Sequence, residues 1–577
     1  MAMFVNPSRR EEFRESILEL MRATKSRLED VLPFAMDPVV YNFEINGVGS
    51  VARLLSGDDA IMPAGYYALQ IPELVRQNPQ NISYLRRVEL DHFTARCNTP
   101  EQTYRMLRTT VSNLFRVSDP ATQTARMAWD AESDEIKRHN GFDPIQHEQI
   151  RADLRNGRIG LAHNRLPVDT TIEDVQRADT VALEENAAWR KVGEAALREG
   201  RVAVLSLAAG VGSRWTTGAG VIKAINPFIQ LAGRHRSFLE IHVAKTRRVA
   251  REYGAAIPHI VSTSFLTHGP IEKHIGLNKN YGYDGPLVLS PGRAIGQRLI
   301  PMVRDLVFLW EEMPQETLDE QKQKVREAVR GALMDWARSK GEGNDYLDNV
   351  PIQRFNPPGH WYEIPNLFRN GVLAGLIEEY PNLETIMLHN IDTLGADLDP
   401  LAVGAHLDGR NLLTFEVVPR RIDDRGGGLA RVNGKVRLLE GLAQPREEDE
   451  LKLSYYNSMT TWIQIAPLLA LFGLERKDLS GREERIVQAV RQMAQRMPTY
   501  VTIKDVKRRW GHGQEDVYPV AQFEKLWSDM TGLPDVRCGY LAVPRLRGQQ
   551  LKDYNQLDAW ANDGSKEYVA KLSGLDG

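Results

Sequence analysis

From residue 200 to about residue 420, short apolar runs alternate with segments of helical spacing. VAVLSLAA, IPHIVSTS, ETIMLHNID and NLLTFEVVP have the β-branched content of buried strands. SFLEIHVAKTRRVAREYG, NLFRNGVLAGLIEEYPNL and LDPLAVGAHLDG have apolar residues at helical intervals. This alternation is typical of a mixed, mainly parallel sheet covered by helices. We therefore expect an α/β, Rossmann-like domain.

The flanking regions predict two further parts. Residues 8 to about 160 read as mostly helical, with REEFRESILELMRATKSRLEDVL and TPEQTYRMLRTTVSNLF as helices. A helix over TIEDVQRADTVALEENAAWRKVGEAALREG is expected to end at Gly200. Past residue 480, GREERIVQAVRQMAQRM predicts a helix and TYVTIKDV a strand. We expect a helical accessory region over 1–165, the main domain over 166–480, and a small α/β region over 481–577 that completes the site.

Composition excludes several classes of partner. The 577 residues include 73 basic and 76 acidic ones, a net charge of −3, so nothing draws the chain to nucleic acid or anionic membrane. Cys97 and Cys538 lie far apart and without metal-type spacing, which indicates a reducing compartment. The N-terminus has no apolar signal region, and no apolar run reaches 18 residues. We expect a soluble cytoplasmic protein.

The strand in VAVLSLAAGVGSRW ends in two glycines, Gly210 and Gly212, which are typical of a backbone that approaches phosphates. A dinucleotide fingerprint needs a third glycine where this chain has Trp215, and no P-loop sequence occurs. Two interpretations remain. The turn binds nothing, or it belongs to a nucleoside triphosphate site to which Lys223 adds positive charge.

Asn390 and Asp392 follow the apolar strand in MLHNIDTLGADLDP. A carboxylate at the carboxyl end of a strand in such a sheet points into the ligand crevice. One carboxylate together with phosphate oxygens is a usual way to hold Mg²⁺. The alternative is that Asp392 caps the next helix. In GLARVNGKVRLLEG, Asn433-Gly434 predicts a hairpin.

Taken in order, these segments resemble the eukaryotic-type UDP-sugar pyrophosphorylases, above all the UTP–glucose-1-phosphate uridylyltransferases. The resemblance covers roughly residues 185 to 550. It rests on LAAGVGSRW, PPGHWYEI, HNIDTLGA, RGGGLARVNGKVRLLEGLAQ, YYNSMTTWI and YLAVPR. HNIDTLGA and KVRLLEGLAQ are its most specific pieces. It implies a nucleotidyltransferase domain of GT-A-like architecture.

The resemblance also implies a reaction and its partners. An oxygen of a sugar-1-phosphate attacks the α-phosphorus of UTP, pyrophosphate leaves, and a UDP-sugar forms without a covalent intermediate. Positioning and neutralisation of charge are then the main tasks, which suit Mg²⁺ and lysines. The partners are UTP and a sugar-1-phosphate, and the cofactor is Mg²⁺.

The family's roles fall on matching positions of this chain. The resemblance implies that nucleotide contacts come from Leu207, Ala209, Gly210, Gly212, Gly359, His360 and Asn390. It implies sugar contacts from Gly427, Gly428, Glu440 and Asn457. Asp392 would hold the metal. The catalytic charges would be Lys223, Arg214 and Arg545.

Departures from the family pattern qualify these roles. Trp361-Tyr362 stands where the family has Gly-Asp and is expected to change the sugar pocket. Ile222 replaces a proline before the phosphate lysine, and the family's base-binding glutamine has only Gln297 as a displaced counterpart.

The late catalytic lysine of the family aligns with Pro544, so Arg545 is expected to supply its charge, with Lys504 and Lys507 also nearby in sequence. Three hypotheses follow. The chain is an active uridylyltransferase, a non-catalytic relative that binds a nucleotide or UDP-sugar, or a transferase of another nucleotide.

Overall fold

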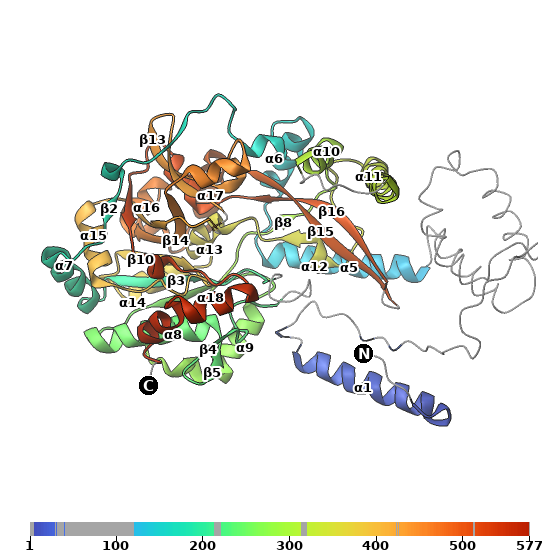
Figure 1. Cartoon of the computed structure of the whole chain (residues 1–577), viewed down its shortest axis with the longest axis horizontal. Coiled ribbons are helices and arrows are strands. Elements are labelled where there is room, and N and C mark those ends of the chain that lie inside the picture. Colours follow the sequence, from blue (N-terminus) through green and yellow to red (C-terminus); the bar gives the residue numbers. More distant parts are fainter. Residues whose placement is uncertain are drawn as a thin grey trace, which may run out of the picture. The chain divides into compact units, whose positions relative to one another are not determined.

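The computed structural model divides into two units. Figure 1 shows the described elements of the chain. The main unit comprises residues 1–39, 135–311 and 343–577, and the second comprises 40–134 and 312–342. The predicted three-part division remains a prediction. The helix expected over TPEQTYRMLRTTVSNLF lies outside the described residues. The described residues are 5–28, 30–31, 38, 40, 120–212, 221–312, 320–422, 424, 426–511 and 514–575.

The main unit is built on a central mixed sheet. Its principal strands run in the order β2 (Val181–Ala182), β17 (Cys538–Ala542), β11 (Leu413–Pro419), β14 (Tyr455–Gln464), β10 (Thr385–Asn390), β3 (Val202–Leu207), β6 (His259–Thr263) and β7 (Leu287–Pro291). All neighbours are parallel except that β14 runs antiparallel to β11 and β10. The expected α/β fold with a mixed, mainly parallel sheet is confirmed.

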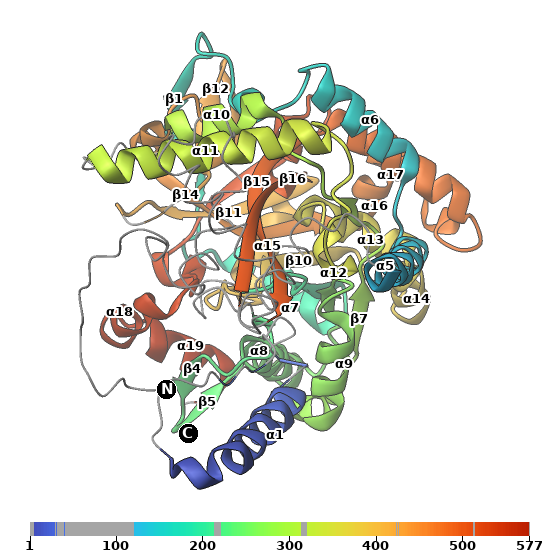
Figure 2. The same cartoon turned by 90° about the vertical axis from the view of Figure 1, so that its right-hand side faces the viewer.

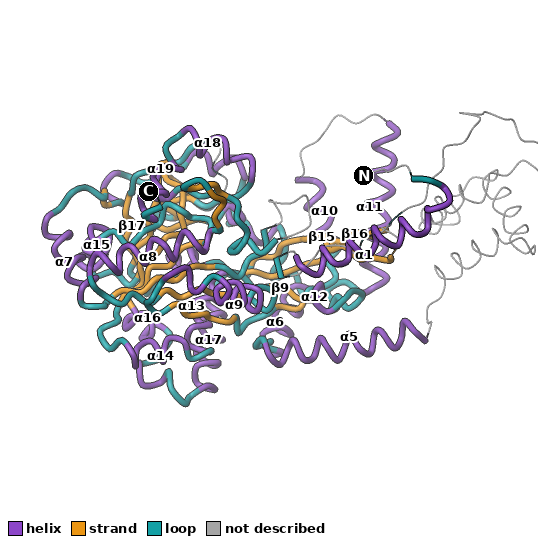
Figure 3. The backbone as a smooth tube through the Cα atoms, turned by 90° about the horizontal axis from the view of Figure 1, so that it is seen from below, coloured by secondary structure: helices purple, strands orange, loops and turns teal. Residues whose placement is uncertain are grey.

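Helices cover both faces of this sheet, because the side chains of its buried strands alternate between two cores. Ala203, Leu205 and Leu207 of β3 pack in one core with α13 (Glu363–Arg369), α14 (Val372–Glu379), α16 (Ile465–Leu471) and α17 (Glu483–Arg496). Val202 and Val204 pack in the other with α7 (Ala187–Arg198), α8 (Phe238–Tyr253) and α15 (Pro400–Gly409). Figure 3 shows α14 and α17 on one side of the strands and α15 on the other.

The C-terminal helices α18 (Leu557–Asn562) and α19 (Ser565–Ser573) lie beside α8, and Figure 2 shows them close to the small β4–β5 hairpin. Trp560 and Val569 are buried in the same core as the first turns of α8. The chain that follows β17 is therefore attached to the central sheet.

Two hairpins complete the main unit. β12 (Gly428–Val432) and β13 (Lys435–Leu439) turn at Asn433 and Gly434, which both have positive φ, as the sequence predicts. β15 (Tyr500–Gly511) and β16 (Gln514–Glu524) form a long two-stranded ribbon (Figure 1). Gly428 also pairs with Tyr456, so the first hairpin meets the central sheet at the start of β14.

Two predicted helices are wrong in part. The segment before Gly200 begins with β1 (Ile172–Asp174) and β2, and α7 starts only after Asn186, whose side chain accepts from the amides of Ala188 and Trp189. Pairing of β1 with β12 overrides the local helical pattern. The helix expected over NLFRNGVLAGLIEEYPNL is divided between α13 and α14, because Gly371 takes a positive φ between them.

The remaining elements have the following bounds: α1 (Arg10–Leu28), as predicted, α5 (Pro120–His139), α6 (Pro144–Arg155), β4 (Ile229–Leu231), β5 (Arg234–Arg236), α9 (His268–Leu277), β8 (Gly296–Gln297), α10 (Val303–Glu312), α11 (Glu320–Lys340), α12 (Pro351–Arg354) and β9 (Phe355–Asn356). Within the described ranges, no helix has the length and apolar character that a membrane span requires.

Candidate functional site

The carboxyl ends of β3 and β10 lie side by side, with Leu207 opposite Asn390. After β3 the chain passes through Ala209, whose carbonyl accepts from Ser264 Oγ at 2.9 Å, to the exposed Gly210. The amide of Gly212 then donates to Val221 O at 2.7 Å. This contact brings Gly212 and Val221 together at the same edge of the sheet. Arg214, within 213–220, lies outside the described residues.

Lys223 and Asp392 meet at this edge. Lys223 Nζ donates to Asp392 Oδ2 at 2.9 Å, although the two residues are 169 positions apart. Asp392 is only 5% exposed. Burial raises the pKa of this carboxyl, but the charges of Lys223 and Lys552 outweigh burial and leave the pKa below its usual value. The carboxylate is therefore ionised at neutral pH.

Asp392 does not cap the following helix. Asp399 does so, because its side chain accepts from the amide of Leu401 at 2.9 Å. The other oxygen of Asp392, Oδ1, is buried and has no hydrogen-bond partner among the described residues. A single unpartnered carboxylate oxygen at a strand end suits Mg²⁺ whose other ligands are phosphate oxygens and water. Among the described residues, no group of three or more acidic, histidine or cysteine side chains could hold a metal alone.

Buried histidines lie beneath the edge and tie its strands together. Ser206 Oγ contacts His389 Nε2 at 2.9 Å and His259 Nε2 at 3.0 Å, which links β3 to both of its neighbours. Burial lowers the pKa of His259 to about 3, so this histidine is neutral at physiological pH.

The four predicted sugar-binding residues gather at one place. The backbone amide of Asn457 donates to Gly427 O at 3.2 Å. Gly428 pairs with both Leu439 and Tyr456. A Cβ on Gly427 would lie 3.4 Å from Glu440 Oε2. Glu440 thus follows β13 directly beside the glycine pair.

Charges of opposite sign act on the carboxyl group of Glu440. Its Oε1 accepts a hydrogen bond from Ser528 Oγ. Burial and the charge of Asp529 raise the pKa of Glu440 to about 8, although Lys552 opposes them. The carboxyl group is therefore mostly protonated at pH 7 and ionises slightly above it.

The Pro-Pro-Gly-His segment is packed against the chain that follows β16. Gly359 has φ +99°, and a Cβ there would lie against the carbonyl of Lys525 and 2.6 Å from its amide nitrogen. His360 Nδ1 accepts from the amide of Trp527 at 3.0 Å, and burial lowers the pKa of His360 to about 4. The fold itself therefore requires this glycine and a neutral histidine. A nucleotide role for Gly359 and His360 remains a prediction.

Trp361 and Tyr362 belong to the core. Trp361 is stacked near Phe472 at 6.1 Å between ring centroids, and its indole N–H points to Met530 Sδ at 3.2 Å. Both side chains are buried. Trp361 fills the hydrophobic interior, and Tyr362 also lines the separate pocket described below. The expectation that this pair changes the sugar pocket remains a prediction.

Arg545 is held by another residue. Its Nη1 and Nη2 each donate to Asp424 at 2.6 Å, a bidentate pair that neutralises the guanidinium. Gln297 also has structural partners, since its Nε2 donates to the carbonyls of Tyr346 and Arg354. Lys504 is exposed on β15, and the side chain of Lys507 is outside the described part of the chain. A catalytic role for Arg545 remains a prediction.

Sequence reasoning missed Lys552. The amide of Leu551 donates to Asp392 O at 2.9 Å, and Lys552 Nζ donates to the hydroxyl of Tyr456 at 2.7 Å. Lys552 is the first lysine after β17. A search for cations beyond the end of the YLAVPR strand would have found it.

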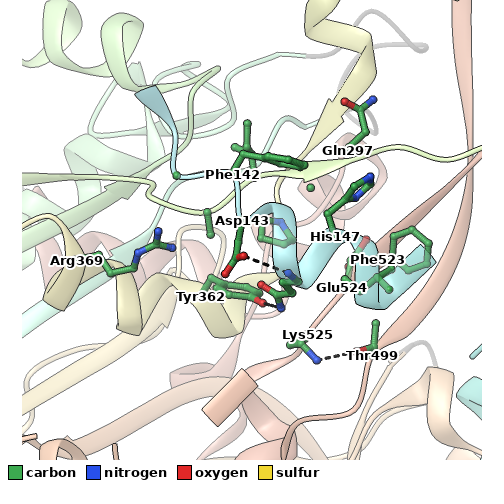
Figure 4. A pocket seen from close by; sticks show the side chains of 17 residues that line it. Phe142, Asp143, His147, Gln297, Tyr362, Arg369, Thr499, Phe523, Glu524 and Lys525 are labelled. Carbon is green, nitrogen blue, oxygen red and sulfur yellow. Dashed lines mark hydrogen bonds between the residues drawn. The ribbon is translucent and has the colours of Figure 1, made fainter. Parts of the chain in front are cut away.

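A separate pocket is lined in part by Pro358 of the Pro-Pro-Gly-His segment. Figure 4 shows this pocket. Its walls come from α6, the loop before β8, the end of β16, and the side chains of Tyr362 and Arg369. Lys525 lies at its margin, with Nζ donating to Thr499 Oγ1 at 2.6 Å. Gln297, the displaced counterpart of the base-binding glutamine, lines this pocket, whereas Lys223, Asp392 and Glu440 do not.

Comparisons with known proteins match the sequence pattern. The family model described as UTP–glucose-1-phosphate uridylyltransferase matches residues 344–493, which include the Asp392, Glu440 and Asn457 segments. The UTP–glucose-1-phosphate uridylyltransferase of Hordeum vulgare is 25% identical over 284 residues, 48% of this chain and 49% of the relative. That of Saccharomyces cerevisiae is 31% identical over 121 residues, 20% of this chain and 24% of the relative.

This chain is similar to the UDP-sugar pyrophosphorylase family over residues 344–493 and, by its barley relative, over 48% of its length. It spans about half the length of the barley relative that it matches, so its own activity and substrate are matters of proposal. Among solved structures it is similar to the UDP-glucose pyrophosphorylase of Leishmania major in complex with UDP-glucose, with a TM-score of 0.45 and 16% identity over 70% of this chain and 76% of that one. The uridine diphosphate N-acetylglucosamine pyrophosphorylase of Trypanosoma brucei gives a TM-score of 0.44 with 16% identity over 70% of this chain and 72% of that one.

Proposed function

We propose that this chain forms a UDP-sugar and pyrophosphate from UTP and a sugar-1-phosphate, with Mg²⁺ as cofactor. The observation that carries the proposal is the contact between Lys223 and Asp392 at the carboxyl ends of β3 and β10. It joins a phosphate-binding cation to a metal-binding carboxylate beside an open glycine turn. The family match supports the same chemistry.

The reaction is a single in-line displacement. A bond forms between an oxygen of the sugar-1-phosphate and the α-phosphorus of UTP. The bond from that phosphorus to the bridging oxygen of the β-phosphate breaks, and pyrophosphate leaves with the electron pair. Mg²⁺, held by Asp392 Oδ1, would supply positive charge to the phosphate oxygens. Lys223 exchanges its bond to Asp392 for bonds to the triphosphate, and thereby neutralises charge on the leaving group.

The other predicted residues position the substrates in this proposal. Leu207, Ala209, Gly210, Gly212 and Asn390 form the strand ends and turn against which the nucleotide lies. Glu440 and Asn457 accept and donate hydrogen bonds to sugar hydroxyls next to Gly427 and Gly428. Arg214 remains a candidate for a further phosphate contact. A cytoplasmic location, where UTP and sugar phosphates occur together, is part of the proposal.

The surroundings of the glycine turn give a physical reason to expect a bound triphosphate there, and not a turn that binds nothing. A Cβ on Gly210 would have no heavy atom of the described chain within 4 Å. The backbone there is open to a ligand, and phosphates approach backbone amides most closely where no side chain intervenes.

The test is release of pyrophosphate by the purified chain with UTP and Mg²⁺ across glucose-, galactose-, N-acetylglucosamine- and uronic acid-1-phosphates. Glucose-1-phosphate comes first, because the matched family is described by it. Turnover with one sugar supports the proposal and identifies the substrate. Parallel reactions with ATP and GTP test transfer of another nucleotide. Binding of UDP-glucose without any turnover would instead support the non-catalytic alternative.

A further inference from the structure

The proposed reaction needs a cation on the sugar-phosphate side of the site as well as on the UTP side. The position that supplies it by resemblance is Pro544, which carries no charge. Its neighbour Arg545 forms the bidentate pair with Asp424, and that carboxylate also accepts from the amide of Arg421 at 2.8 Å. Turning Arg545 toward a substrate would break both bonds and remove the guanidinium charge from the buried Asp424, which is costly.

The chain after Arg545 returns to the metal-binding loop. Gln549 O accepts from the amide of Gly395, and Gln550 Nε2 donates to Thr393 Oγ1 at 3.3 Å. Leu551 then donates its amide to Asp392 O at 2.9 Å. These contacts fix three successive residues of the segment against the loop that carries Asp392. Lys552 is the next residue.

The side chain of Lys552 turns toward the sugar side of the site. Its Nζ donates to the hydroxyl of Tyr456 at 2.7 Å and lies 5.4 Å from the centroid of that ring. Tyr456 precedes the predicted sugar residue Asn457 and pairs with Gly428. The same hydroxyl donates to Gln550 Oε1 at 3.2 Å, so the tyrosine holds the lysine and its own segment together.

The charge of Lys552 affects the pKa of two carboxyl groups of the site. It contributes to the low pKa of Asp392 and opposes the rise in the pKa of Glu440. The ammonium group is thus within electrostatic range of both the metal-binding and the sugar-binding carboxyl groups. A sugar-1-phosphate bound with its sugar at Glu440 and its phosphate toward Asp392 would place that phosphate in the same range.

We infer that Lys552, and not Arg545, binds the phosphate of the sugar-1-phosphate and stabilises the negative charge on it as it attacks UTP. This inference rests on the proposed function. It divides the charge between two lysines, with Lys223 at the triphosphate and Lys552 at the sugar phosphate. The chain therefore replaces a strand-end lysine with one from the segment that follows β17.

The test compares K552M, which removes the charge and keeps the length, with K552R and with K571M as control. Lys571 is an exposed lysine of α19. K552M is expected to lower kcat about 10²-fold, as loss of one preorganised charge does at such a centre. Its KM for the sugar-1-phosphate should rise several-fold, while its KM for UTP stays within about two-fold. K552R should recover part of kcat, and K571M should match the wild type.

The outcomes separate this inference from the proposed function. If the wild type turns over and the kcat of K552M lies within about two-fold of the wild-type kcat, the role of Lys552 is overturned. The proposed function then still stands. If the wild type gives no turnover, calorimetric titration with UDP-glucose decides. About ten-fold weaker binding by K552M then supports Lys552 without the transferase function. Equal binding, or no binding by the wild type, overturns the inference. If K552M does not fold, K552Q takes its place.

Discussion

Two segments that the family resemblance assigns to the nucleotide have different surroundings in this molecule. The turn after β3 is open, and a Cβ on Gly210 would meet no heavy atom of the described residues within 4 Å. The Pro-Pro-Gly-His segment is closed, because Gly359 and His360 contact the backbone of Lys525 and Trp527. Both segments contain a glycine for close approach, but among the described residues only the first leaves space beside its glycine.

A glycine in a shared motif can serve either ligand binding or the fold. A glycine that faces open space is free to serve binding, while a glycine whose Cβ would strike another backbone serves the fold. The same holds for the charges. Asp392 keeps one buried oxygen without a partner, whereas Arg545 has both terminal nitrogens engaged by Asp424. Substitutions at the open edge should change turnover, and substitutions in the packed segment should change stability first.

The largest effect is expected for D392N. Loss of the carboxylate removes the proposed Mg²⁺ ligand and the partner of Lys223, and we expect kcat to fall about 10³-fold. Asp399 offers a matched control, because D399N keeps a side chain that can cap α15. D399N should retain wild-type kcat and thermal midpoint. A D392N variant that turns over at the wild-type rate would remove Asp392 from the site.

The comparison itself is tested by G359A and G210A. At Gly359 an alanine combines an unfavourable φ with a clash against Lys525, and we expect it to lower the free energy of unfolding by about 3 kcal/mol or more. G210A should change stability by less than about 1 kcal/mol but raise the KM for UTP about ten-fold, because its methyl group enters the space proposed for the phosphates. Urea unfolding and steady-state kinetics on both variants measure this. Equal losses of stability would break the distinction between the two segments.

Much of this fold could be predicted from local pattern. The alternation of strands and helices and the Asn433-Gly434 turn are confirmed because each depends on nearby residues. The start of α7 was misplaced because β1 exists only through its pairing with β12, which no local pattern contains. Burial of Trp361 is likewise a tertiary fact, since the pattern alone cannot tell a core tryptophan from one that lines a pocket.

The candidate site shows the same limit. Lys223, Asp392 and the residues around Glu440 could be named from motifs, and the structure brings the first two into contact. Lys552 belongs to no motif. It is the first lysine after β17, but only the path of the chain shows why it matters. Its distance from Asp392 in sequence hides the contact that Leu551 makes with that residue.

A smaller effect on the open edge is expected from pH. Glu440 has a pKa of about 8, so its carboxyl group is mostly neutral at pH 7 and ionised at pH 9. The ionised form accepts stronger hydrogen bonds from sugar hydroxyls. The KM for the sugar-1-phosphate should therefore fall by up to about ten-fold between pH 7 and pH 9, following the ionised fraction. E440Q should give a flat profile over this range. A wild-type KM that does not change would mean that Glu440 does not contact the sugar.

The smallest effect is expected in the folding stability that the packed segment contributes at acidic pH. Burial lowers the pKa of His360 to about 4 in the folded chain, and the neutral imidazole accepts from the amide of Trp527. Between the usual pKa of about 6.5 and pH 4, the unfolded chain binds this proton and the folded chain does not. Stability from this contact is therefore complete above about pH 6.5 and is lost by about 1 kcal/mol per pH unit as the pH falls below it.

The variant H360N isolates this contribution from those of the other buried histidines, such as His259. The amide oxygen of asparagine can accept from the same backbone amide but does not take up a proton. Urea unfolding at pH 7.0 and pH 5.5 should give a loss of stability for the wild type that exceeds the loss for H360N by about 1 kcal/mol. Turnover by H360N at pH 7.5 should stay near the wild-type rate if the segment serves the fold. A large fall in kcat with unchanged stability would instead return His360 to the nucleotide, and the packed segment would join the open edge as part of the site.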